Sequence, residues 1–199
     1  METKLFKPRL EIPEKGNKWY NKTPDGVSRC ILGKPTVEGL NCLANCVGYA
    51  SGRWGELLGT TKYSYICRAE AFFESGIRDG LQVSDIPALG AYMVWAKGDA
   101  STKKDGSGHV SIVEKIYSKD DVLTSESQYN GTPFTVIRRK KENGNWGKKE
   151  GDYTFLGFVY PPITFIDESD LLDRIYVARD YLEESINILN SVEDIILKK

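Results

Sequence analysis

The stretch Asn41-Cys-Leu-Ala-Asn-Cys-Val-Gly-Tyr-Ala-Ser-Gly-Arg-Trp54 sets the organisation that we expect, because it joins a helix start to a cysteine. Asn45 is a favourable helix N-cap, and apolar residues recur after it at helical spacing. The pattern therefore predicts Cys46 in the first turn of a helix that ends near Gly59. Free backbone N–H groups and the positive end of the helix dipole stabilise a thiolate there. A buried structural cysteine on an apolar helix face is the other interpretation of this stretch.

The single histidine of the chain, His109, is the residue that can serve this cysteine as a base. It follows a glycine-containing loop and begins a strand-like run of mostly apolar residues at 110–116. Glu126 and Gln128 stand two apart at the end of the next predicted strand, so their side chains share one face. An acceptor there could bind the second ring nitrogen of His109 and fix its tautomer. A loop histidine and a solvated strand-end carboxylate, both without a role, are the alternatives.

Five blocks of sequence follow one another between residues 1 and 162: Asn45–Arg53, Leu89–Trp95, Gly108–Glu114, Ser125–Gly131 and Phe155–Pro161. In content, order and spacing they resemble CHAP domains, the cysteine, histidine-dependent amidohydrolase/peptidases found chiefly in bacteriophage lysins and bacterial cell-wall enzymes. The resemblance implies that Cys46 is the nucleophile, His109 the general base and Glu126 the residue that orients His109. It also implies a papain-like fold of the NlpC/P60-CHAP type.

Two positions differ from patterns common in that family. Many members have an asparagine where this chain has Gln128, so the resemblance assigns Gln128 either to tuning the active site or to donating to an oxyanion. Some phage CHAP domains have an aspartate-rich calcium loop just before the cysteine. The corresponding residues 30–40 contain a single acidic residue, too few oxygen ligands for calcium. We therefore expect no calcium requirement, no other metal and no cofactor.

The expected order of elements is helices first and an antiparallel sheet after them, an α+β arrangement that agrees with the implied fold. Residues 1–29 are rich in proline, lysine and glycine and are predicted to form an extended arm over the domain. A second helix is predicted at Ile66–Glu74, ended by Ser75-Gly76. Strands are predicted at 91–95, 109–117, 121–127, 133–139 and 154–160.

Residues 163–199 are expected to be a helical extension that follows a catalytic domain at 1–162. From about Asp167 the chain lacks glycine and proline, and a heptad pattern appears, with seven of eight positions apolar. These positions are Leu171, Ile175, Ala178, Leu182, Ser185, Leu189, Val192 and Ile196. Such a helix packs on another helix, so we expect either a homo-oligomer formed through 167–199 or docking of the helix on the catalytic domain.

Composition excludes several classes of partner. With 27 basic and 28 acidic residues among 199, the formal net charge of −1 provides no field that favours nucleic acid or an anionic membrane. The cluster Arg138-Arg-Lys-Lys141 is interpreted as a strand end running into a solvated hairpin turn, with an anionic wall polymer as the alternative. The cysteines at 30, 42, 46 and 67 lack paired Cys-x-x-Cys spacing, which favours free thiols over a zinc site.

The resemblance to CHAP domains implies a hydrolase that cleaves an amide bond of bacterial peptidoglycan, and we expect it to act in phage lysis of a Gram-positive host. The bond is either the N-acetylmuramoyl–L-alanine amide or a peptide bond of the stem or cross-bridge. No secretory signal and no run near the ~18 apolar residues of a membrane span are visible. We therefore expect synthesis in the host cytoplasm and action at the wall after release. A wall-binding or tail structural module, and a cysteine amidase toxin, are the alternatives.

Overall fold

Three helices and two sheets make up the part of the chain that the structure, a computed structural model, describes: residues 2–14, 16–20, 45–65, 67–98, 107–129, 131–146 and 153–197. The helices are α1 (Cys46–Leu58), α2 (Ala71–Arg78) and α3 (Glu168–Leu197). The strands are β1 (Thr3–Leu5), β2 (Val83–Ser84), β3 (Tyr92–Lys97), β4 (His109–Ser118), β5 (Asp121–Glu126), β6 (Thr135–Lys140), β7 (Tyr153–Val159) and β8 (Thr164–Ile166).

The larger sheet is antiparallel throughout and has the strand order β2-β7-β3-β4-β5-β6. Each of the five predicted strands is present, with ends within two residues of the prediction. Helices α1 and α2 precede this sheet in the chain and pack on it. The predicted α+β fold, with N-terminal helices on an antiparallel sheet, is confirmed.

Helix α1 begins and ends where the sequence predicts. The Asn45 side chain accepts a hydrogen bond from the backbone N–H of Gly48 at 2.9 Å, so it caps the helix start. Gly59 adopts the left-handed conformation, with φ of 70°, and its N–H donates to the carbonyl of Gly55. These two caps place Cys46 as the first residue of the helix.

The prediction for the second helix is wrong in its bounds. Helix α2 spans Ala71–Arg78, and Ser75-Gly76, predicted to end the helix, lie inside it. A Cβ atom on Gly76 would lie 2.4 Å from a methyl carbon of Val159 on β7. Gly76 therefore allows α2 to approach the sheet closely, and the helix ends before Gly80, whose φ is 73°.

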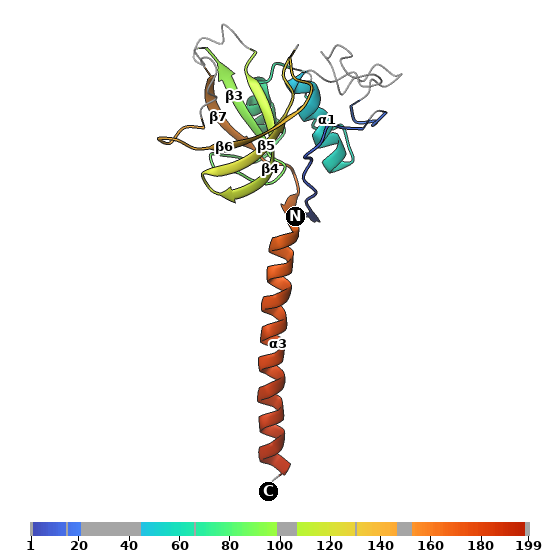
Figure 1. Cartoon of the computed structure of the whole chain (residues 1–199), viewed down its shortest axis with the longest axis vertical. Coiled ribbons are helices and arrows are strands. Elements are labelled where there is room, and N and C mark those ends of the chain that lie inside the picture. Colours follow the sequence, from blue (N-terminus) through green and yellow to red (C-terminus); the bar gives the residue numbers. More distant parts are fainter. Residues whose placement is uncertain are drawn as a thin grey trace.

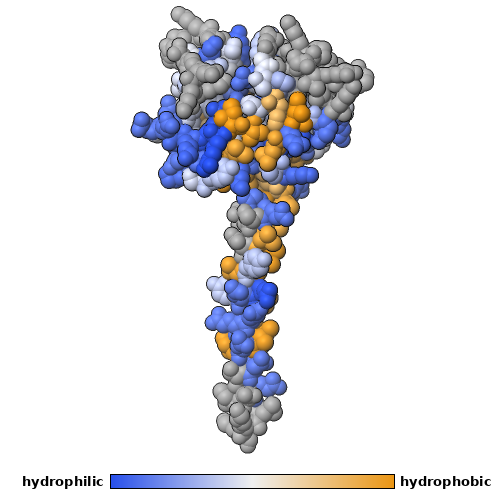
Figure 2. Space-filling view, viewed as in Figure 1, coloured by the Kyte–Doolittle hydropathy of each residue, from blue (hydrophilic) through white to orange (hydrophobic). Residues whose placement is uncertain are grey.

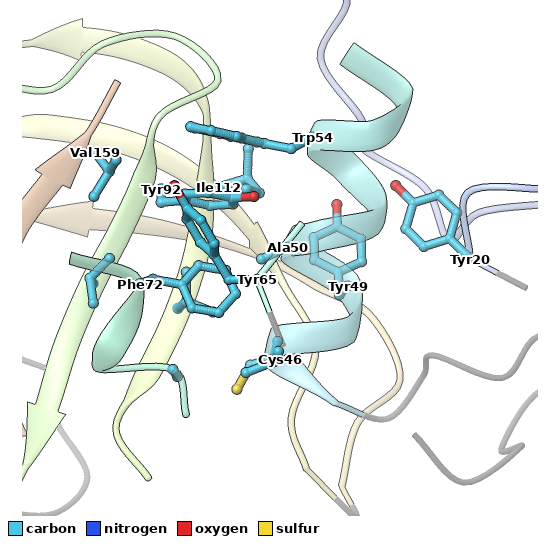
Figure 3. Packing of buried hydrophobic residues seen from close by; sticks show 14 residues of the cluster. Tyr20, Cys46, Tyr49, Ala50, Trp54, Tyr65, Phe72, Tyr92, Ile112 and Val159 are labelled. Atoms are coloured by element: carbon cyan, nitrogen blue, oxygen red, sulfur yellow. The ribbon is translucent and has the colours of Figure 1, made fainter. Parts of the chain in front are cut away.

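Alternate residues of the central strands build two cores on the two faces of the sheet. Tyr92 and Val94 of β3 face the helices, where the ring of Trp54 stacks on Tyr92 with centroids 3.7 Å apart. Met93 and Trp95, one position on, face a second core that includes Trp146. Figure 3 shows the first core, with Cys46 at the beginning of α1 and at one end of the cluster.

The segment 2–20, apart from residue 15, lies against the domain, with Phe6 and Tyr20 buried. Strand β1 pairs in parallel with β8, which lies beyond residue 162, the predicted end of the catalytic domain. Helix α3 follows β8 and extends away from the sheet and from α1 (Figure 1). The structure therefore does not show α3 docked on the domain. None of the helices in the described residues is long and apolar enough to cross a membrane.

Candidate active site

Cys46 lies in the first turn of α1, where several donors converge on its sulfur. The sulfur contacts the backbone N–H groups of Val47 and Val110 and the side chain of His109. Val110 and His109 belong to the start of β4, so the helix start and the strand start meet at this atom. The thiol is buried, as is the imidazole beside it.

The contact between Cys46 and His109 favours their charged forms. Burial opposes a thiolate at Cys46, but the hydrogen bond and charge of His109, with the two backbone N–H groups, outweigh it and lower the pKa of the thiol. Burial likewise opposes an imidazolium at His109, but contacts with Cys46 and Glu126 raise the pKa of its ring. Each residue therefore favours the charged form of the other, and a thiolate beside an imidazolium is the reactive state of a cysteine nucleophile.

Glu126 stands on the other side of His109, at the end of β5. Its Oε2 lies 3.1 Å from Nε2 of His109, and the carboxylate is fully buried. The ring N–H does not point at this oxygen with the geometry of a directed hydrogen bond, so the contact is that of an ion pair. Burial raises the pKa of Glu126, but the contact and charge of His109 and the charge of Arg139 outweigh it and lower this pKa to about 2. Glu126 is thus an anion that stabilises the imidazolium.

Two sets of hydrogen bonds fix the position of α1 relative to β4 and β5. The backbone N–H of Asn45 donates to the hydroxyl of Ser127 at 2.9 Å, which joins the start of α1 to the end of β5. The guanidinium of Arg53 on α1 donates to both carboxylate oxygens of Glu114 on β4, at 3.0 and 2.9 Å. Cys46 and His109 are therefore positioned by bonds elsewhere on the helix and strand that carry them.

The sequence that carries this site is similar to a known protein family. Residues 37–128 match the family model of the CHAP domain. Over these residues the chain is similar to CHAP domains. The matched residues include Cys46, His109, Glu126 and Gln128.

A solved structure similar to part of this chain is that of an N-acetylmuramoyl-L-alanine amidase from Staphylococcus aureus. The two are 25% identical, with a TM-score of 0.40. The similarity covers 48% of this chain and 27% of the amidase chain. No curated protein matches this chain.

Gln128 is the predicted site residue without a hydrogen bond to the other three among the described residues. Its backbone forms a turn: the N–H donates to the carbonyl of Thr132 at 2.9 Å, and the carbonyl accepts from Gly131. Among the described residues, no hydrogen bond joins the half-buried Gln128 side chain to Cys46, His109 or Glu126. The structure thus brings three of the four predicted residues together.

Arg139 is a neighbour of the site that the sequence analysis missed, and it lies beyond the matched part of the CHAP domain. Its Nη2 donates to Oε2 of Glu126 at 2.5 Å, and its Nε donates to the hydroxyl of Thr124 at 3.1 Å. The guanidinium also stacks over the ring of Trp95, 4.9 Å from its centroid. The interpretation of residues 138–141 as a solvated turn is wrong for Arg139, whose side chain is only 9% exposed.

The predictions about metals and cysteines can be compared with the structure only in part. The described residues contain no group of three histidine, cysteine or acidic side chains that could hold a metal ion. Residues 30–40, Cys30 and Cys42 lie outside the described residues. Cys67 is a free thiol whose pKa is raised by burial, in contrast to Cys46. The pKa shifts of the two described thiols therefore have opposite directions, down for Cys46 and up for Cys67.

Proposed function

We propose that this CHAP domain hydrolyses an amide bond of bacterial peptidoglycan, with Cys46 as the nucleophile. The observation that carries the proposal is the buried contact of Cys46 with His109 at the start of α1, backed by the carboxylate of Glu126. A helix start, a thiolate and an imidazolium together provide what acyl transfer from an amide to sulfur requires.

In the proposed reaction, the Cys46 thiolate attacks the amide carbonyl carbon and forms a tetrahedral oxyanion. The N–H groups of Gly48 and Tyr49 bind Asn45, and that of Val47 lies at the sulfur, so we assign the N–H of Cys46 to the oxyanion. The His109 imidazolium protonates the leaving amine as the C–N bond breaks, which leaves a thioester and a neutral imidazole. This imidazole then takes a proton from a water molecule that attacks the thioester, and the thiolate is released.

Glu126 has an electrostatic role in this scheme. Its buried charge stabilises the imidazolium that donates the proton to the amine and that forms again when water attacks. It remains ionised throughout, since its pKa of about 2 lies far below neutral pH. The carboxylate therefore stabilises the charged form of His109 without taking part in proton transfer.

The substrate and setting that we propose follow from the resemblance to CHAP domains. The bond is the N-acetylmuramoyl–L-alanine amide or a peptide bond of the stem or cross-bridge. The setting is phage lysis of a Gram-positive host, with synthesis in the host cytoplasm and action at the wall after release.

The test is loss of turbidity of purified Gram-positive cell walls, followed by mass spectrometry of the released fragments. We expect clearing by the wild type and none by Cys46→Ala, with normal clearing by the matched control Cys67→Ala. New amino groups and the masses of the fragments identify which amide was cut. If the wild type and Cys46→Ala bind several wall types equally and cut none, the chain is a binding module. Cleavage of model amides without cleavage of walls would indicate a cysteine amidase with another substrate.

A further inference from the structure

Helix α3 carries more exposed large hydrophobic side chains than any other element of the described structure. Its 30 residues make a rod about 45 Å long. Among the described residues, nine of the sixteen large hydrophobic side chains that are exposed belong to it. Figure 2 shows hydrophobic surface recurring along α3 between hydrophilic stretches. An exposed apolar surface of this extent is typical of a surface that another protein chain covers.

The apolar surface of α3 is wider than a two-helix seam. The heptad pattern places Ile175, Leu182 and Leu189 at its a positions, with Leu171 and Ala178 at d. In a two-stranded coiled coil, the flanking e and g positions are usually charged. In the sequence of α3, five of the eight flanking positions are apolar and three are charged. Four of the apolar ones have described side chains, all exposed: Leu172, Tyr181, Ile186 and Ile188. Apolar residues at a, d and the flanking positions form a stripe wider than the a/d seam of a two-stranded coiled coil, as on helices that face the core of a bundle.

We propose that α3 is an assembly surface, occupied by the α3 helices of further copies of this chain, with more than two helices in the bundle. From Asp180 onward the opposite side of α3 suits water, since it carries polar and acidic residues: Asp180, Glu183, Glu184, Asn187 and Asn190. Nearer the start of the helix the same side carries the exposed Tyr176 and Val177. An acidic polar face also disfavours an anionic lipid surface, which binds helices rich in lysine and arginine. The assembly joins several CHAP domains, and each contact with a polymeric wall would strengthen the others.

Sedimentation equilibrium of the full chain over a range of concentrations tests this proposal. We expect a mass more than twice the 22.4 kDa of one chain. The variant Leu182→Glu/Leu189→Glu should sediment as a monomer with unchanged helical circular dichroism. The matched control Glu184→Gln/Asn187→Ser changes the polar face of the same helix and should keep the wild-type mass. The variant Ile186→Lys/Ile188→Lys should lower the mass, because it places charge on the second contact face.

Several outcomes would overturn the proposal. A monomeric mass for the wild type would contradict the assembly. A dimeric mass would contradict a bundle of more than two helices. A large mass that Leu182→Glu/Leu189→Glu leaves unchanged would place the contact elsewhere on the chain. Co-sedimentation of the wild type with phosphatidylglycerol vesicles, together with a monomeric mass in their absence, would assign the surface to lipid. None of these readouts depends on wall hydrolysis.

A second inference concerns Arg139 and rests on a separate observation. A single oxygen of Glu126, Oε2, lies 2.5 Å from Nη2 of Arg139 and 3.1 Å from Nε2 of His109. Among the described residues, these are the charged groups that face Glu126, one from β6 and one from β4. Thr124 and the ring of Trp95 fix the guanidinium from two further sides. The carboxylate is therefore held between two cationic groups.

We infer that Arg139 is a positioning residue that holds the Glu126 carboxylate, ionised and correctly placed, beside His109. Burial raises the pKa of Glu126, and the charges of Arg139 and His109 lower it. Without the guanidinium only His109 lowers this pKa, so Glu126 takes up a proton at a higher pH. A neutral Glu126 stabilises the imidazolium less well, and the thiolate of Cys46 is lost with it. This inference rests on the proposed roles of Cys46 and His109, but it can be tested without any wall substrate.

The test is the rate of alkylation of Cys46 by iodoacetamide as a function of pH, resolved from Cys67 by peptide mass spectrometry. The rate for Cys46 falls when the pH becomes acidic, and we call the pH of this fall its acidic midpoint. We expect the acidic midpoint to rise by at least about one pH unit in Arg139→Met. Arg139→Lys, which keeps the charge, should move it less. Arg138→Met is the matched control, because that neighbouring side chain is 53% exposed and binds Asp121.

If Arg139 has only a structural role, its loss lowers the alkylation rate at every pH and leaves the acidic midpoint unchanged. That result would overturn the inference. An unmoved profile in Arg139→Met at full rate would overturn it as well. Failure of the proposed function gives a different result: the shift in alkylation would be present while wall cleavage is absent. The two ideas therefore fail in distinguishable ways.

Discussion

Replacing Arg53 by methionine should both destabilise the protein and loosen the site. The Arg53 guanidinium binds Glu114 through two hydrogen bonds, and the side chains are only 4% and 0% exposed. Glu114 also accepts hydrogen bonds from the hydroxyl of Ser125 at 2.7 Å and the backbone N–H of Arg9 at 2.8 Å. In Arg53→Met these two donors remain, but the buried carboxylate loses the cation that binds it directly.

The expected cost follows from that uncompensated charge. Breaking a buried ion pair by removing one partner costs about 3–5 kcal/mol, whereas an exposed pair is worth about 0–1 kcal/mol. For a chain of this length, each kcal/mol lowers the melting temperature by about 2–4 °C. We therefore expect Arg53→Met to melt roughly 6–20 °C below the wild type. The matched control Arg78→Met removes an exposed ion pair with Asp79 and should melt near the wild-type temperature.

Urea unfolding followed by tryptophan fluorescence measures the free energy, since Trp54, Trp95 and Trp146 are buried. The double variant Arg53→Met/Glu114→Gln should lose less than the sum of the two single variants, because the second change removes the unpaired charge. Alkylation of Cys46 at neutral pH should also slow in folded Arg53→Met, since the lost bond joins α1 to β4. The reasoning is refuted if Arg53→Met unfolds within about 1 kcal/mol of the wild type.

Three further predictions concern single positions. Asn45→Ala removes the cap of α1 and should cost about 1 kcal/mol in urea unfolding, while Asn45→Asp keeps an acceptor and should cost less. Gly52→Ala brings a Cβ to 2.7 Å from the ring of Tyr20, so we expect a loss of about 1–3 kcal/mol and faster proteolysis of the segment 2–20. The pKa of Glu126 is lowered from 4.5 to about 2, so its contribution to stability is present above pH 4.5 and is lost as the pH falls toward 2. Stability measured across that window should fall by about 3 kcal/mol more in the wild type than in Glu126→Gln, and equal slopes would contradict the assignment.

The sequence was sufficient to predict α1 and the central strands because their signals are local. An N-cap at Asn45, a glycine at the helix end and runs of alternating apolar residues each act within a few positions. The same local rules predicted the wrong end for α2. Gly76 looks like a helix stop in the sequence, but it is inside the helix because the side chain of Val159, more than eighty residues later, leaves no room for a Cβ atom. No neighbouring residue carries that information.

The contact of Arg139 with Glu126 is a part of the site that could not be predicted from the sequence. Successive side chains of a strand point to opposite faces, so a strand over these residues places Arg139 on the face opposite to Arg138. What the sequence does not show is the register, which sets Arg139 opposite Val122 and so on the face of β5 that carries Thr124 and Glu126. A charged cluster at a strand end was therefore interpreted as solvated, although one member is bound to the predicted orienting residue.

The site is best understood as a meeting of three elements whose positions are fixed by other residues than those that react. Cys46 is placed by the cap of α1, His109 by the first pair of β4 with β3, and Glu126 by its place between His109 and Arg139. A thiolate–imidazolium pair depends steeply on separation, because the Coulomb energy rises as the distance shortens and as water is excluded. Substitutions at the ties that join these elements should therefore alter the reactivity of Cys46 before they unfold the chain.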